Sequence, residues 1–345
     1  MAKIVLLKGH LARALGAGLV FSAATAVALV VSAQPAEAGY AFQDIVNPND
    51  VTFNQELGIN NSGEIAGYFG SGAAGHPNKG YTTSAPYTSF TNENFPGSIQ
   101  TQVTGINNVG TTVGFWSTSN LGVGKDPNFG FVDQNGTFTN VNNPATGPGL
   151  PTNQLLGVNN SDLAVGFYVD AASATHGYTY NIAAKTFSAN IDDPNGVGAT
   201  TATAINNANE IAGFYINSVG NTEGFVDDNG TFTTIDPGGS TDTMLLGIND
   251  NGFAVGAYVD SGGVMQGLLY DLNNNTFQNI DDPFGIGTTT INGINDQNQL
   301  VGFYVNGTGN TIGLRATPVP EPSTLLLLGA GLLGMAAFVR RQRKG

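Results

Sequence analysis

The sequence predicts an all-β fold, a six-bladed β-propeller of four-stranded blades closed by the N-terminal strand and flanked by an N-terminal signal helix and a C-terminal transmembrane helix. Three observations support this prediction. One phrase recurs six times at intervals of 43 to 52 residues, further strand-like segments separate the copies, and a lone strand-like segment precedes the first copy. Four short strands in such a period are typical of a propeller blade. A β-solenoid and a stacked sandwich are the alternatives.

The repeated phrase reads Gly-Ile-Asn in most copies and leads through a turn into a second apolar segment. Five residues after each start stands a glycine, asparagine or aspartate, the residue types that best tolerate left-handed backbone. A tight hairpin is therefore predicted in each copy. A glycine inside each second strand indicates close backbone approach. The copies begin at Gly58, Gly105, Gly157, Ala204, Gly247 and Gly293, and the second glycines are Gly67, Gly114, Gly166, Gly213, Gly256 and Gly302.

Two more strands are predicted after the hairpin in each unit. The third begins at glycine, as in Gly130-Phe-Val-Asp, and the fourth carries Thr-Phe, as in Thr137-Phe-Thr. Asn-Pro or Asp-Pro then breaks the strand. Alternating β-formers between such breakers are strong strand signals.

The two ends of the repeat region indicate a closed ring. Tyr40–Val46 reads as a copy of the fourth strand, whereas the sixth unit stops at a third strand, Ile312–Thr317. Pairing these two segments would remove both exposed sheet edges, which an open solenoid would leave unpaired. We therefore expect a propeller domain at residues 39–317.

Few residues in this region have catalytic potential. His76 and His176 are the only histidines after residue 38, so a three-histidine zinc site is impossible. No serine stands in a G-x-S-x-G context. Paired carboxylates could cleave glycosides, but they recur in several repeats, whereas an active site is normally single. We predict no enzymatic activity.

The carboxylates suggest one metal, Ca²⁺, and no other cofactor. Asp192, Asp193, Asp281 and Asp282 stand at strand ends in corresponding repeat positions. Equivalent positions lie at one level of a ring, so these groups could converge as oxygen ligands for calcium. The alternative is that aspartate before proline only forms turns.

Aromatic residues follow the second glycine of most repeats. Packing between blades is the first explanation, because aromatic side chains bury large areas. The second explanation is stacking on sugars at a rim, for which Trp116, the only tryptophan, is the candidate.

The N-terminus has the features of a secretory signal peptide, residues 1–38. Basic residues precede the apolar stretch Leu15–Ala33, and Ala36-Glu37-Ala38 supplies a cleavage site for signal peptidase after export by the Sec machinery. An uncleaved N-terminal anchor is the alternative. Export follows in both cases.

The C-terminus contains an uncharged segment, Thr324–Val339. As a helix it would be about 24 Å long, short of the roughly 30 Å hydrocarbon core. Arg340, Arg341, Arg343 and Lys344 would hold its end on the cytoplasmic side. A helix buried in a soluble domain is the alternative.

This tail, residues 318–345, resembles the PEP-CTERM sorting tail of exopolysaccharide-producing Gram-negative bacteria. The resemblance rests on Val319-Pro320-Glu321-Pro322-Ser323-Thr324, the leucine-rich segment and the arginine cluster, in that order. It implies recognition by an exosortase, cleavage near Pro320–Pro322 and only transient residence in the inner membrane.

The repeats are also similar to extracellular HAF-type repeats. The similarity rests on the six Gly-Ile-Asn phrases and on His176-Gly177-Tyr178, which departs from His-Ala-Phe at its last two positions. That family has no settled biochemical role, so the similarity implies export and says little about activity.

Composition limits the partners. Between Gly39 and Pro322, four bases face 24 carboxylates, a net charge of −20. Such a surface repels phosphate backbones, so no nucleic-acid partner is predicted. The absence of cysteine excludes disulfides and thiolate metal sites.

The combined prediction is an exported protein: a membrane-tethered precursor with a periplasmic propeller, then a cell-surface or extracellular matrix component. We expect it to bind exopolysaccharide or another surface polymer. A polysaccharide hydrolase or lyase and a purely structural matrix protein are the alternatives.

Overall fold

The structure, a computed structural model, describes residues 39–319 with the exception of residue 197. This part forms 24 β-strands, and none of it is a helix long enough and apolar enough to cross a membrane. The predicted signal helix and transmembrane helix lie outside the described residues.

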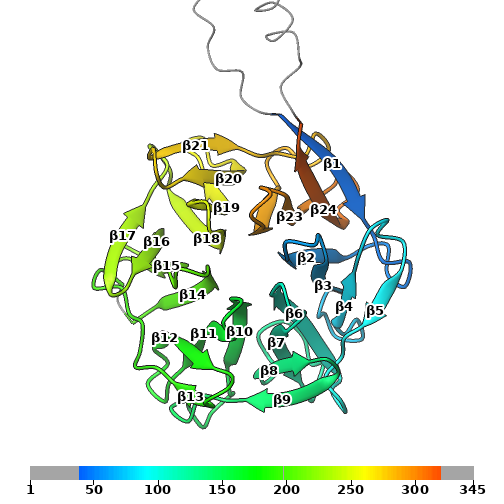
Figure 1. The fold of residues 1–345 in the computed structure, drawn as a ribbon, viewed down its shortest axis with the longest axis vertical. Helices are drawn as coiled ribbons and strands as arrows, with labels where there is room; N and C mark the ends of the chain where they lie inside the picture. Colours follow the sequence, from blue (N-terminus) through cyan, green and yellow to red (C-terminus); the bar gives the residue numbers. More distant parts are fainter. Residues whose placement is uncertain (1–38, 197, 320–345) are drawn as a thin grey trace, which may run out of the picture. The chain divides into compact units, whose positions relative to one another are not determined.

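The strands form six antiparallel four-stranded sheets arranged around an axis, which confirms the predicted six-bladed propeller (Figure 1). Blade 1 comprises β2 (Asn54–Ile59), β3 (Ile65–Phe69), β4 (Lys79–Thr83) and β5 (Phe90–Asn92). Blade 2 comprises β6 (Gln100–Ile106), β7 (Thr112–Ser117), β8 (Phe129–Gln134) and β9 (Thr137–Val141). Blade 3 comprises β10 (Asn153–Val158), β11 (Leu163–Val169), β12 (Thr175–Asn181) and β13 (Thr186–Phe187).

The next two blades repeat this order from the innermost to the outermost strand. Blade 4 comprises β14 (Thr200–Ile205), β15 (Ile211–Ile216), β16 (Thr222–Asp228) and β17 (Thr231–Ile235). Blade 5 comprises β18 (Asp242–Ile248), β19 (Phe253–Val259), β20 (Met265–Asp271) and β21 (Thr276–Asn279).

Blade 6 joins the two ends of the chain. Its strands are β22 (Thr290–Ile294), β23 (Leu300–Val305), β24 (Thr311–Pro318) and, outermost, β1 (Tyr40–Ile45). The β1–β24 ladder is antiparallel, from Tyr40 opposite Pro318 to Ile45 opposite Gly313. The predicted closure by the N-terminal strand is therefore confirmed, although both strands differ by a residue or two from the predicted bounds.

The hairpin of each repeat has the predicted backbone. All six residues expected in the left-handed region have positive φ: Gly63, Gly110, Asp162, Asn209, Gly252 and Asn298. The glycines inside the second strands are enforced by close approach, since a Cβ on Gly166 would lie 1.9 Å from the backbone oxygen of Gln154. Each innermost strand also contains a register shift, which the sequence pattern did not predict.

The hydrophobic core lies mainly between adjacent blades. One cluster joins Val113 and Val132 of blade 2 to Leu155 and Tyr168 of blade 3. The second aromatic of most repeats is buried there, for example Tyr215 and Tyr304, each 3% exposed. Packing between blades therefore explains why these aromatic residues recur, which was the first explanation given in the sequence analysis.

Candidate functional site

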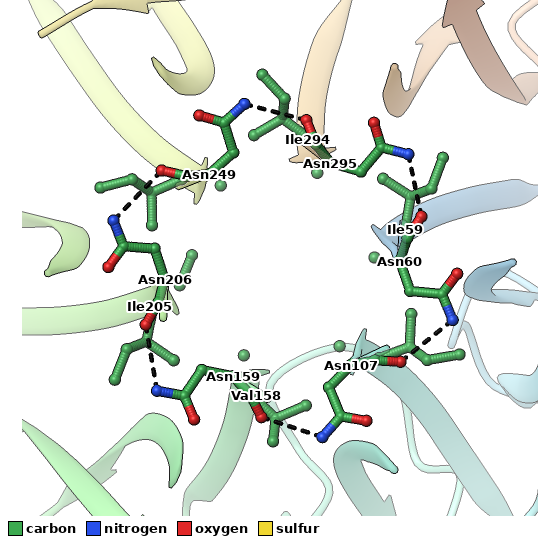
Figure 2. A pocket seen from close by; sticks show the side chains of 18 of the residues that line it. Ile59, Asn60, Asn107, Val158, Asn159, Ile205, Asn206, Asn249, Ile294 and Asn295 are labelled. Atoms are coloured by element: carbon green, nitrogen blue, oxygen red, sulfur yellow. Dashed lines mark hydrogen bonds between the residues drawn. The ribbon is translucent and has the colours of Figure 1, made fainter. Parts of the chain in front are cut away.

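A closed ring of asparagines surrounds the axis. It is formed by the asparagine of each Gly-Ile-Asn phrase: Asn60, Asn107, Asn159, Asn206, Asn249 and Asn295. Each Nδ2 donates a hydrogen bond, 3.0 to 3.3 Å long, to the backbone oxygen of its counterpart in the next blade (Figure 2). The bond from Asn295 to Asn60 joins residues 235 positions apart and completes the circle.

The same side chains close their own turns. In each repeat the asparagine Oδ1 accepts hydrogen bonds from the amides two and four residues later, as from Ser62 and Glu64 to Asn60. One side chain therefore fixes both a hairpin and the joint between two blades. This dual role explains why asparagine recurs there in all six copies.

A second ring lies one residue further along the chain. Each backbone amide donates, at 2.7 to 3.0 Å, to the side-chain Oδ1 of its counterpart in the next blade. The participants are Asn61, Asn108, Asn160, Asn207, Asp250 and Asp296. Each blade thus donates two hydrogen bonds to the next blade at the axis, one from an asparagine side chain and one from a backbone amide.

Little space remains on the axis itself. Beside the rings, leucine alternates with a polar residue from blade to blade: Leu57, Thr104, Leu156, Thr203, Leu246 and Asn292. The cavity they share with the rings measures about 110 Å³, room for a few water molecules at about 30 Å³ each. We therefore interpret the axis as a structural joint.

A larger cavity, here called the loop pocket, lies at the opposite end of the innermost strands, between blades 1, 2 and 3. Its volume is about 550 Å³, within the range of small-molecule sites. Gln100 and Gln102 line it from the start of β6, and Gln154 lines it from the start of β10. Phe53, Tyr68, Phe115 and Trp116 supply its aromatic surface.

Two long loops form much of the wall. The connection between the second and third strands is five residues long in blades 3 to 6, but nine in blade 1 (residues 70–78) and eleven in blade 2 (residues 118–128). Asn120 joins the two loops: its Oδ1 accepts from the Gly75 amide at 2.7 Å, and its Nδ2 donates to the Gly72 oxygen at 3.1 Å. Only these two blades carry extended loops, and the pocket lies beside them.

Asp126 holds the longer loop in shape. Its carboxylate accepts hydrogen bonds from Ser119 Oγ, Gln100 Nε2 and the amides of Leu121 and Gly122. Burial would raise the pKa of Asp126, but these four donors together hold it below its usual value. The group is therefore ionised and fully engaged.

Trp116 does line the loop pocket, but it is not free on both faces. Its ring stacks on Phe95, with centroids 4.3 Å apart and planes at 6°, and its Nε1 donates to Asn140. It therefore belongs to a fixed aromatic wall. Stacking on sugars stays a prediction.

The carboxylates proposed for calcium lie in two separate places. Asp192 and Asp193 follow the outermost strand of blade 3, and Asp281 and Asp282 follow that of blade 5. In Asp193 and in Asp282, one carboxylate oxygen accepts a hydrogen bond from the backbone amide two residues later. This is the turn-forming role that the sequence analysis gave as the alternative to calcium binding. Within residues 39–319, no group of three or more histidine or acidic side chains is arranged to hold a metal. Calcium binding stays a prediction.

His176 is held between Asp192, one of these acids, and Asp170 of the short loop of blade 3. Its Nδ1 lies 2.9 Å from Asp192, and its Nε2 lies 3.5 Å from Asp170. Both ring nitrogens thus face carboxylates, which ties the short loop of blade 3 to the end of its outer strand.

Two acids of blade 1 were missed in the sequence analysis: Glu56, which is buried, and Glu93, which is half-buried. Glu56 is fully buried on β2, and burial raises its pKa to about 8. Burial and the neighbouring carboxyl of Asp133 raise the pKa of Glu93. In the other five blades an apolar residue stands where Glu56 does, opposite the second glycine, so the break in the repeat pattern was the available signal.

The extended loops also had a sequence signal that was missed. The second glycine and the glycine of the third strand are eleven residues apart in blades 3 to 6, but 13 in blade 1 and 16 in blade 2. The other predicted residues, Ala36, Ala38, Pro320, Glu321, Pro322, Arg340, Arg341, Arg343 and Lys344, lie outside the described part.

Comparison with protein families finds the PEP-CTERM protein-sorting motif at residues 318–344. This motif indicates an exported protein that an exosortase processes and sorts to the cell envelope. The match confirms the predicted tail, and it begins within β24. No curated protein matches the chain. The similarity to HAF-type repeats stays a prediction.

Solved structures of similar fold are distant. AofleA from Arthrobotrys oligospora is 11% identical, with 82% of this chain and 90% of that chain covered and a TM-score of 0.49. TolB from Acinetobacter baumannii is 9% identical, with 77% and 64% covered and a TM-score of 0.46. A Trypanosoma rangeli sialidase is 7% identical, with 81% and 58% covered and a TM-score of 0.48. The chain spans less than two thirds of the latter two, and none of these likenesses bears on function.

Proposed function

We propose that this exported propeller binds a polysaccharide of the producing cell's surface in the loop pocket. The observation that carries the proposal is the concentration of specialised features in one place. The two extended loops, an aromatic wall and a set of amide side chains all meet at one cavity between blades 1 and 3. Loops that depart from the repeat are a common place for binding in such proteins.

The lining suits a sugar. Aromatic rings offer apolar surface to the C–H faces of a saccharide, while amide groups offer hydrogen bonds to its hydroxyls. The groups stand on strands of sheets that the rings hold against one another at the far end of the innermost strands. A polymer segment would therefore meet a largely preformed surface.

Binding is proposed in preference to catalysis because the pocket is poor in reactive groups. Glycoside hydrolysis commonly requires two carboxyl groups flanking the bond. Asp126 is the only acid that lines the loop pocket, and both of its oxygens already accept hydrogen bonds. This favours retention of the polymer over its cleavage.

We further propose the route to the envelope: a precursor tethered in the inner membrane of a Gram-negative cell, with the propeller in the periplasm, then exosortase cleavage and display at the cell surface. The motif at residues 318–344 supports exosortase processing.

The test is to incubate purified residues 39–319 with the native exopolysaccharide, with and without Ca²⁺. We expect the protein to co-sediment with the polymer and no new reducing or unsaturated ends to form. New chain ends would favour the lyase or hydrolase function. Absence of co-sedimentation would favour a purely structural role.

A further inference from the structure

We propose that the loop pocket selects saccharide segments that carry hydroxyl groups and no acid groups. This inference rests on the proposed function, because it names the class of ligand for the same site.

The orientation of two amide pairs fixes what the pocket offers. Asn78 donates its Nδ2 to the backbone oxygen of Gly70, so its Oδ1 must accept from Gln102 Nε2, which lies 2.9 Å away. The Oε1 of Gln102 then faces away from that bond. It has no hydrogen-bond partner within the described part of the chain.

Blade 3 repeats this arrangement against blade 2. Asn128 donates its Nδ2 to the backbone oxygen of Asp126, and its Oδ1 accepts from Gln154 Nε2. The Oε1 of Gln154 is likewise left without a partner among residues 39–319. Two neighbouring strand starts therefore each present a free carbonyl oxygen, which accepts hydrogen bonds from hydroxyl groups and repels a carboxylate or sulfate, beside the second N–H of the same amide.

The charges around the pocket act in the same direction. Asp126 is the only charged residue that lines the cavity, and hydrogen bonding keeps it ionised. A nearby anion would be repelled, and it would meet no cation within the lining. The strong negative charge of the mature chain adds to this repulsion at low salt.

Lys125 is the nearest exception, because it lies in the extended loop of blade 2. Its side chain is exposed and is not part of the cavity lining. Lys79, on β4, is held by the backbone oxygen of Ile99 at 2.7 Å. The exposed apolar side chains of Val123 and Leu150 occupy the rim instead, 80% and 49% exposed.

The test measures binding of matched oligosaccharides to residues 39–319, whose strands make up the complete closed ring. The probes are neutral gluco- and galacto-oligosaccharides and oligogalacturonides of equal length. We expect at least about tenfold tighter binding of a neutral probe, equivalent to about 1.4 kcal/mol, and little change in its affinity between low and high salt.

Variants separate the contributions. Gln154→Leu should lower affinity for neutral probes, Lys125→Ala should not, and Val123→Lys should raise affinity for oligogalacturonides. Val219→Lys is the matched control, because Val219 is 79% exposed in the corresponding loop of blade 4. Tighter binding of the acidic probes by the unmodified protein, or loss of binding in Lys125→Ala, would overturn this inference alone. Failure of every saccharide, including the native polymer, would overturn the proposed function instead.

Discussion

Glu56 is a carboxyl group enclosed at the joint between the first and last blades. Its Oε1 accepts a 2.6 Å hydrogen bond from Tyr81, whereas its Oε2 has no partner in the described part of the chain. A Cβ on Gly67 or on Gly313 would lie 2.6 Å from one of these oxygens, so the group fills a gap between two glycines. Among the described residues no basic side chain forms an ion pair with it, and Arg315 packs over the ring of Tyr87 instead. Burial therefore raises the pKa of Glu56 to about 8 and favours its protonated form at neutral pH.

This position predicts a pH dependence of stability. The folded-state pKa is raised, from 4.5 to about 8, so the stabilising contribution is complete below pH 4.5 and is lost as the pH rises toward 8. Relative to its value at pH 4.5, the contribution should be smaller at pH 7 by on the order of 3 kcal/mol. Denaturant unfolding at several pH values should show a shallower slope over this range for Glu56→Gln.

The control keeps the site apolar, as in blade 2, where Val103 and Phe131 stand at the equivalent positions. The double variant Glu56→Leu with Tyr81→Phe should unfold without this pH dependence and be the more stable protein at pH 8. Equal pH slopes in the unmodified protein and Glu56→Gln would show that Glu56 ionises in the folded state.

At the scale of elements, Asn120 couples the two extended loops across blades. Its two hydrogen bonds are each worth about 1 kcal/mol, and they lie outside the sheets. Asn120→Ala should therefore weaken polymer binding by several-fold and lower the unfolding midpoint by no more than several degrees. Titration calorimetry and thermal unfolding measure the two effects.

Asn310→Ala is the matched control, because Asn310 ends the corresponding loop of blade 6. The coupling role is refuted if both variants bind the polymer as the unmodified protein does.

Removal of the outermost strand of blade 6, β1, should destabilise the fold more than the substitution of Asn120 does. Deletion of residues 39–46 removes all six residue pairs between β1 and β24 and exposes an edge. We expect this variant to lose its cooperative unfolding transition by circular dichroism. A transition at the original midpoint would mean that the ring closes without β1.

The sequence predicted most of these elements and few of their contacts. The turn positions from Gly63 to Asn298 follow from local patterns, because backbone conformation is locally encoded. The closing pair of β1 and β24 follows from the repeat itself, because one end has an extra fourth strand and the other end lacks one. The rings at the axis do not, since Asn295 and Asn60 meet only once six blades are placed. The loop pocket could be located only in part: the spacing between glycines shows which loops are long, but not that Asn120 joins them.

The aspartates predicted to bind calcium occupy equivalent positions in the repeats, but this equivalence does not bring their carboxylates together. Positions that correspond in a ring lie at one level, but Asp193 and Asp282 follow outermost strands, so their blades hold them apart. Equivalent residues approach one another near the axis, just after the innermost strands, where the backbone amide of Asp250 donates a 3.0 Å hydrogen bond to Asp296 Oδ1.

At the scale of the whole molecule, the ends of the described chain leave the ring together. Tyr40 pairs with Pro318, and the amide of Val319 donates to the oxygen of Gly39 at 2.8 Å. The sorting motif thus begins in a paired strand, directly before Pro320. The sorting motif therefore starts where the closed ring ends.

Replacement of Pro320, Glu321 and Pro322 by alanine should block processing and leave the ring intact. Mass spectrometry and immunoblotting of cell fractions should show accumulation of the uncleaved precursor and loss of the surface form. Unchanged processing would mean that the motif is not the recognition element.

The central claim, that one pocket beside the extended loops retains the polymer, is tested most directly by a loop exchange. Residues 118–127 are replaced by the five residues 217–221 of blade 4, a change that keeps every strand and Asn128. Affinity electrophoresis in gels containing the native polymer then compares both proteins. We expect the exchanged protein to unfold at a similar temperature and to migrate without retardation. Undiminished retardation would contradict the claim and place binding elsewhere on the ring.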